Sequence, residues 1–197
     1  MTNFLLLTSI TITIVCYLYI LLLKSISKNG KDKASQTVIE LTKDDNSIHL
    51  VENKDGFINK YLIKRKIIKL TPSTYNSNSI FNISIAYLFS GYTKLDNKKI
   101  NTVGKIIPYI YPISFTPIIS CLISIISKTS MDAKISIIFL ILILIYQYII
   151  YDQNIEAVEK LEANDKSIIE SLNKIILISK IFFVTTLIQI LRLILMI

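Results

Sequence analysis

The chain has 197 residues and a formal net charge of +8, its mean hydropathy is +0.54, and 52% of its residues are hydrophobic. So much apolar surface, gathered in long uncharged stretches, is typical of membrane proteins and excludes an ordinary soluble domain. Because His49 is the only histidine and Cys16 and Cys121 are the only thiols, zinc sites built on several imidazoles or on Cys/His clusters are excluded.

The chain begins with a membrane anchor over residues 1–23. Residues 4–23 are uncharged and would form about 30 Å of helix, enough to cross a bilayer. The three residues before this run carry no positive side chain, and no small-residue cleavage site follows it. These features favour a retained anchor over a cleaved signal peptide.

Residues 24–105 form a polar insert with a mixed secondary-structure pattern. Ser35 is expected to cap a short helix, and three short apolar stretches are expected to form a small antiparallel sheet. Ser79 is expected to cap a further helix, because apolar residues recur after it at helical spacing. The ranges are 36–42 for the first helix, 48–51, 57–63 and 65–70 for the strands, and 79–92 for the second helix.

Residues 106–151 are expected to form two transmembrane helices. The first, residues 106–127, contains Pro108, Pro112 and Pro117, so we expect a broken helix, with a re-entrant hairpin as the alternative. The second, residues 135–151, is almost entirely apolar and aromatic.

The last part of the chain combines an inner segment with a final span. Residues 152–174 form an amphipathic segment, with Ile155, Val158 and Leu161 opposite several glutamates. Residues 175–197 form the last transmembrane helix. Its polar residues are Lys180, Gln189 and Arg192. They have two interpretations: the side chains of Lys180 and Arg192 reach the lipid headgroups, or Gln189 and Arg192 form a buried polar pair.

The lysines set the expected orientation. Residues 24–105 hold 15 of the 22 basic residues, which places this insert in the cytoplasm. With four spans, both termini then lie outside. The sequence therefore predicts a mostly α integral membrane protein, with four transmembrane helices and a small cytoplasmic α+β insert. The excess of isoleucine and lysine over arginine indicates a low-GC genome, and we expect the cytoplasmic membrane of such a bacterium as the location.

The lipid bilayer is the first expected partner of this basic chain. Nucleic-acid binding is not expected, because the basic insert has few arginines and no aromatic residues interleaved with its charges. The usual phosphate-binding and nucleophile motifs are absent from the sequence. Carboxylates recur at Glu156, Glu159 and Glu162, a spacing more typical of a solvated helix face than of a metal site.

Several stretches together resemble the YugP-like family of bacterial membrane zinc metallopeptidases, also called neutral zinc metallopeptidases. That family has an anchor, a strand unit, a helix with an H-E-x-x-H motif, two spans, an inner segment and a final span. The resemblance covers roughly residues 35–197. It is carried by the strand unit from Gly56 to Thr71, by Thr74-Tyr75-Asn76 with Ser79-Ile80, by Tyr151-Asp152 with Ala157-Val158 and Leu161, and by Leu187, Gln189, Leu191-Arg192 and Leu193.

The motif that defines the family is missing from this chain. Carried forward from Tyr75, its register falls on residues 88–92, where only Gly91 matches, and the further glutamate ligand falls on Ile150. Leu88 and Phe89 donate no electron pair to a metal, and a phenol such as Tyr92 is a poor zinc ligand at neutral pH. The resemblance therefore implies a site without its zinc, in which Asp152 is a remnant that once supported the ligands.

The resemblance implies a pseudopeptidase that binds a membrane-protein partner, a paralogue or a membrane substrate without cleaving it. No cofactor is expected, because the residues that would bind zinc are replaced. Two alternatives remain. One is an unrelated membrane scaffold or complex subunit. The other is a transporter element, to which the proline-broken span and the polar residues of the last span would point.

Overall fold

The computed structural model of the chain describes residues 2–56, 58–95, 109–110, 116–161 and 165–197. They fall into two compact units. The bundle unit comprises Met1–Leu22, Ile113–Tyr151 and Leu177–Ile197, and the mixed unit comprises Leu23–Pro112 and Asp152–Ile176.

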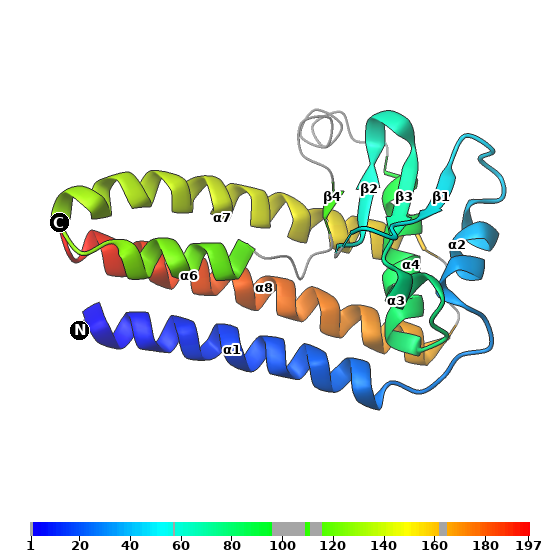
Figure 1. Cartoon of the computed structure of the whole chain (residues 1–197), viewed down its shortest axis with the longest axis horizontal. Helices are drawn as coiled ribbons and strands as arrows, with labels where there is room; N and C mark the ends of the chain where they lie inside the picture. Colours follow the sequence, from blue (N-terminus) through cyan, green and yellow to red (C-terminus); the bar gives the residue numbers. More distant parts are fainter. Residues whose placement is uncertain (1, 57, 96–108, 111–115, 162–164) are drawn as a thin grey trace. The chain divides into compact units, whose positions relative to one another are not determined.

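The bundle unit is built from helices that run roughly side by side along one direction (Figure 1). Its described elements come from α1 (Thr2–Ile26), α6 (Thr116–Ile126), α7 (Ser130–Glu159) and α8 (Lys166–Ile194). Among the described residues, α1, α7 and α8 are long and apolar enough to cross a membrane. Their outward side chains are apolar, as at Phe4, which is 70% exposed. This pattern indicates an integral membrane protein.

The second expected span, residues 106–127, differs from the prediction. Tyr109–Ile110 forms a strand, β4, so the expected broken helix is wrong at these two residues. The helix of this region, α6, has 11 residues, or about 16 Å, roughly half of a bilayer core. Its Pro117 lies in the first turn, where proline is tolerated. Pro108 and Pro112 lie outside the described residues, and four spans are not shown.

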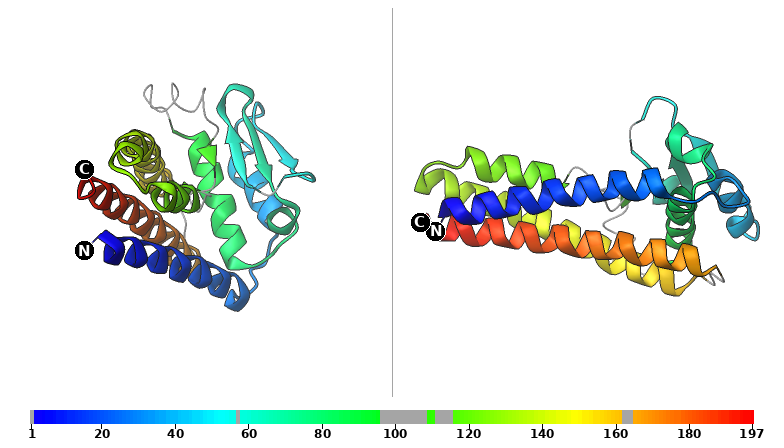
Figure 2. Two further views of the ribbon diagram at one scale, coloured as in Figure 1. Left: turned by 60° about the vertical axis from the view of Figure 1, so that its left-hand side comes forward. Right: turned by 90° about the horizontal axis from the view of Figure 1, so that it is seen from below.

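Large apolar, small and polar side chains share the interior of the bundle. Ala133, Leu140 and Leu193 form a fully buried cluster, which joins the end of α8 to the first turns of α7. Small residues let membrane helices approach closely. Figure 2 shows both ends of the chain at the same end of this bundle. The fully buried polar residues of the bundle include Ser9, Ser120, Ser124, Thr186 and Gln189.

The mixed unit contains a four-stranded sheet in the order β1-β3-β2-β4. Its strands are β1 (His49–Glu52), β2 (Lys60–Leu62), β3 (Ile67–Leu70) and β4. The 3-10 turn η1 (Ile63–Arg65) joins β2 to β3 and ends at Lys66, whose φ of 50° lies in the left-handed region. Strand β3 therefore begins two residues after Arg65, where the sequence pattern had placed its start.

The fully antiparallel sheet expected from the sequence is wrong in one pairing. Strands β2 and β3 are antiparallel, but β1 pairs with β3 in parallel, with His49 opposite Ile67. Strand β1 therefore lies beyond β3 instead of beside β2, its neighbour in sequence. Apolar alternation fixes which side chains point inward, not which strands become neighbours.

Two helices of the mixed unit pack on each other, α2 (Ala34–Thr42) and α4 (Ile80–Thr93). The expected cap of α2 is wrong: its N-cap is Lys33, whose backbone N–H donates to Gln36 Oε1 at 2.8 Å, and Ser35 is buried in the first turn. The expected cap of α4 is confirmed, because Ser79 Oγ accepts from the backbone N–H of Asn82 at 3.3 Å. The single turn α3 (Pro72–Tyr75) lies between the sheet and α4 in the chain.

Candidate functional site

Helix α4 carries the positions at which the peptidase-like register falls. It starts at Ile80, directly after its cap Ser79, and the hydroxyl of Ser27 accepts a hydrogen bond from the backbone N–H of Phe81 at 2.8 Å. Residues 81–86 and 88–92 of this helix are all buried. A helix that is apolar and buried all round lies in a core.

The residues of that register lie in the core of the mixed unit. Leu88 and Phe89 are fully buried, and Tyr92 is 2% exposed. The rings of Phe89 and Tyr92 meet edge to face, with centroids 5.4 Å apart. These side chains fill space as apolar packing does.

A close helix contact accompanies these residues. A Cβ added at Gly91 would lie 2.7 Å from the carbonyl oxygen of Ala157 and 2.9 Å from its Cβ. The inner residues 152–159 of α7 therefore pack directly against α4, because both helices have small residues at the contact.

The inner part of α7 differs at two positions from the amphipathic segment that the sequence predicts, whereas Leu161, just after the helix, is buried as expected. Its buried residues are Gln153, Asn154 and Ala157, whereas Ile155 and Val158 are only half-buried. The contact with α4 is made by the small Ala157, by Asn154, which bonds to Tyr92, and by the predicted apolar residue Leu161, which is buried and lies 3.0 Å from a Cβ added at Gly91. Residues 162–164, which include Glu162, lie outside the described part of the chain.

Tyr92 and Asn154 connect the two helices. The hydroxyl of Tyr92 donates a hydrogen bond to Oδ1 of Asn154, inside the core. Within the described residues, Nδ2 of Asn154 and both side-chain polar atoms of Gln153 have no partner. Both amide residues are fully buried. A buried amide without a hydrogen bond costs about 1–3 kcal/mol, so this polar group is an expensive feature of the core.

Sequence reasoning did not single out this pair of amides. Asp152, the residue that it named in this region, is exposed. A signal was present: Gln153 and Asn154 lie three or four residues before Ala157, on one side of the helix. Ile150 is 5% exposed and belongs to the bundle unit.

The residues at the register do not fit a zinc ion. Leu88 and Phe89 have no donor atom, and Tyr92 uses its hydroxyl on Asn154. Within the described residues, no group of three or more His, Cys, Asp or Glu side chains could hold a metal ion. His49 lies on β1 with an exposed side chain, and Glu156 pairs with Lys160 at 3.3 Å.

The bundle unit holds the polar residues of the last span. Gln189 is fully buried and its Nε2 donates to Sγ of Cys121 at 3.1 Å, while Lys180 is exposed. Arg192 is 5% exposed and donates from one terminal nitrogen to the carbonyl and the hydroxyl oxygen of Ser124, the latter at 3.0 Å. Both Gln189 and Arg192 therefore contact α6 inside the bundle.

Comparisons with known proteins give no relatives for this chain. No protein-family model matches it, and searches of curated proteins and of solved structures find no match either.

Proposed function

We propose that the chain is a membrane-embedded pseudopeptidase that binds a membrane-protein partner or a membrane substrate without cleaving it. The observation that carries this proposal is the filling of helix α4. Each residue of the peptidase-like register on that helix, Leu88, Phe89 and Tyr92, lies in the core. Apolar residues are the substitutions that a buried site favours once it no longer holds a charged metal.

The proposed orientation places the mixed unit in the cytoplasm. Its residues 24–105 hold most of the lysines, and basic segments stay inside. The same unit contains Leu23–Pro112 and Asp152–Ile176, the segments that precede and follow residues 113–151. The chain between them must leave and re-enter on one side of the membrane. Since α7 is long enough for one crossing, the proposed four-span topology assigns the other crossing to residues 106–127.

Two measurements on the purified full chain test the lack of peptidase activity. Elemental mass spectrometry on protein prepared without chelator should find no stoichiometric zinc. Incubation with a casein substrate should release no peptides above the level of a buffer blank. About one zinc per protomer, together with cleavage that a chelator abolishes, would contradict the proposal.

In-cell crosslinking tests the binding role. A photoreactive amino acid at Ile39, which is 58% exposed on α2, should capture a discrete membrane protein. The same group at Phe4, which is exposed on α1, is the matched control and should give no such band. A complex that survives purification with fixed stoichiometry would favour the alternative of a complex subunit, and no captured protein at any exposed position of the mixed unit would remove the support for a binding role.

A further inference from the structure

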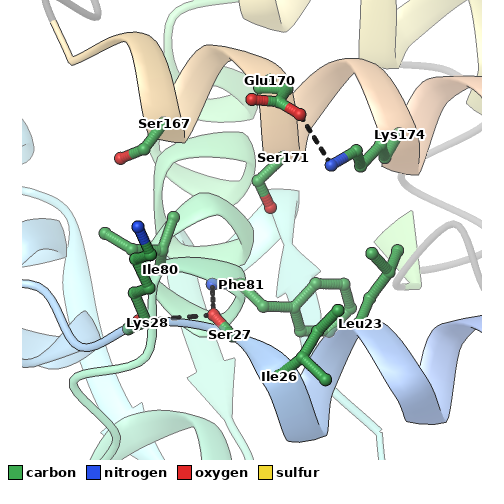
Figure 3. A pocket seen from close by; sticks show the side chains of 10 residues that line it. All are labelled: Leu23, Ile26, Ser27, Lys28, Ile80, Phe81, Ser167, Glu170, Ser171 and Lys174. Carbon is green, nitrogen blue, oxygen red and sulfur yellow. Dashed lines mark hydrogen bonds and ion pairs between the residues drawn. The ribbon is translucent and has the colours of Figure 1, made fainter.

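The mixed unit contains two adjoining hollows. The first lies beside the ends of the apolar stretches of α1 and α8. It has a volume of about 180 Å³ and is shown in Figure 3. Leu23, Ile26 and Phe81 form its apolar side, and Ser171 points into it. The second hollow, of about 550 Å³, shares Lys28, Ile80 and Ser167 with the first.

The first hollow lies at the level at which two candidate spans reach the membrane surface. Leu23 is the last residue of the uncharged run 4–23 on α1. Lys174 directly precedes the apolar run 175–197 on α8, and it also lines the hollow. Residues at such boundaries lie among the phosphates and glycerol backbones of the lipids.

The two hollows differ in charge: in the described part of the chain, the first offers an unpaired lysine, and the charged side chains of the second are mainly carboxylates. In the first, Lys174 is paired with Glu170 at 2.8 Å, and Lys28 has no ion-pair partner among the described residues. The second has an acidic side and a half-buried phenol, with Lys31 at its rim. Its carboxylates and phenol are Asp32, Glu40, Asp165 and Tyr87.

The electrostatics of Tyr87 agree with this acidic side. Burial raises the pKa of Tyr87, and the carboxylates of Glu40, Asp165 and Asp32 raise it further. Counted over both hollows, three lysines face four carboxylates. A purely anionic headgroup would therefore gain little from the site as a whole, whereas a ligand with both charges would meet opposite charges on both sides.

We propose that the adjoining hollows bind the headgroup of a zwitterionic phospholipid with a primary ammonium, of the phosphatidylethanolamine type. Lys28 and Ser171 meet its phosphate, and the apolar side of the first hollow meets the start of its acyl chains. Its ammonium enters the second hollow between Asp32 and Glu40, which lie in the loop before α2 and on α2. Three N–H donors make a primary ammonium suited to several carboxylates at once. This binding does not depend on a peptidase ancestry.

Native mass spectrometry of the full chain in mild detergent tests the proposal. Delipidated protein receives phosphatidylethanolamine, phosphatidylcholine or phosphatidylglycerol of the same acyl chains. We expect the ethanolamine lipid to give the largest bound fraction, because the choline lipid lacks N–H donors and the glycerol lipid lacks the cation. Free phosphoethanolamine is the fourth ligand: if it displaces the lipid at equal concentration, the headgroup alone accounts for binding, and if it does not, the acyl part contributes.

Matched variants locate the site. Lys28→Ala and the double variant Asp32→Asn/Glu40→Gln should each weaken binding of the ethanolamine lipid at least about ten-fold, because the first removes one charge-assisted contact and the second removes two. The control Lys24→Ala removes an exposed lysine of α1 that does not line either hollow, and it should leave binding unchanged. Ser171→Phe should block the first hollow. A preference for the glycerol lipid, or equal binding by the wild type and all of these variants, would overturn the proposal.

Discussion

At the scale of single residues, the core of the mixed unit keeps polar groups where apolar ones would suffice. Gln153 and Asn154 are fully buried, and Tyr92 gives its hydrogen bond to Asn154. A buried donor or acceptor that loses its partner costs more than a pair that is removed together. The Tyr92–Asn154 bond therefore fixes how α4 and the inner part of α7 meet.

The variant Tyr92→Phe tests this bond. Removal of the hydroxyl should lower the free energy of unfolding by about 1–2 kcal/mol, because Oδ1 of Asn154 loses its donor in the core. The double variant Tyr92→Phe/Asn154→Leu should recover part of that loss. Tyr19→Phe, at a site that is 38% exposed on α1, is the control. Chemical unfolding in detergent, followed by circular dichroism, measures all three, and equal stability of Tyr92→Phe and the wild type would show that the bond is unimportant.

Arg192 illustrates how far sequence reasoning reaches for one residue. Its distance from the chain end left two readings open, a side chain that reaches the headgroups or a buried group. In the bundle unit, Arg192 is buried and bonded to Ser124. The sequence could not settle this, because the position of α6 beside α8 depends on packing between segments that lie far apart in the chain.

At the scale of elements, the helices that depend on nearby residues could be predicted from capping residues and apolar spacing. The Ser79 cap and the apolar spacing after it predicted α4, and the structure confirms that helix. Long apolar runs predicted α1, α7 and α8 for the same reason. The parallel partner of β1 and the length of α6 were missed, since both depend on contacts distant in sequence.

The contact between α4 and α7 leads to a prediction about Gly91. In Gly91→Ala, the new methyl group would meet the backbone oxygen of Ala157, which cannot move by itself. The two helices must separate, and we expect unfolding to become easier by about 1–3 kcal/mol. Gly91→Ala/Ala157→Gly should regain part of this stability.

Gly30→Ala is the matched control for that substitution. Its added Cβ would meet Cδ1 of Ile83 at 2.5 Å, the far end of a flexible side chain, so the neighbour can rotate away. Thermal unfolding of the purified chain compares the variants. If Gly30→Ala destabilises the protein as much as Gly91→Ala, the close approach of α4 and α7 has no special importance.

At the scale of the whole molecule, the order of segments constrains the topology more than the hydropathy of any one helix. The mixed unit takes chain from before and after residues 113–151, and α7 alone accounts for one crossing of that stretch. In the proposed orientation the whole mixed unit lies on one side of the membrane, which requires an even number of crossings between its two segments. The short α6 is therefore the element on which the proposed four-span topology depends, although its length alone argues against a full span.

Cysteine labelling in intact cells tests this topology. Asn3→Cys lies in the first turn of α1 and Met131→Cys lies in the first turn of α7, and both positions are exposed. A membrane-impermeant maleimide should label both without permeabilisation, because one proposed crossing separates each position from the cytoplasmic residues 24–105. Lys54→Cys and Glu159→Cys, in the mixed unit, should react only after permeabilisation. The wild type is the control, since Cys16 and Cys121 are buried and should stay unlabelled. If Met131→Cys is protected together with Lys54→Cys, the chain does not cross the membrane between residue 54 and α7, and the crossing by α7 then separates the two segments of the mixed unit.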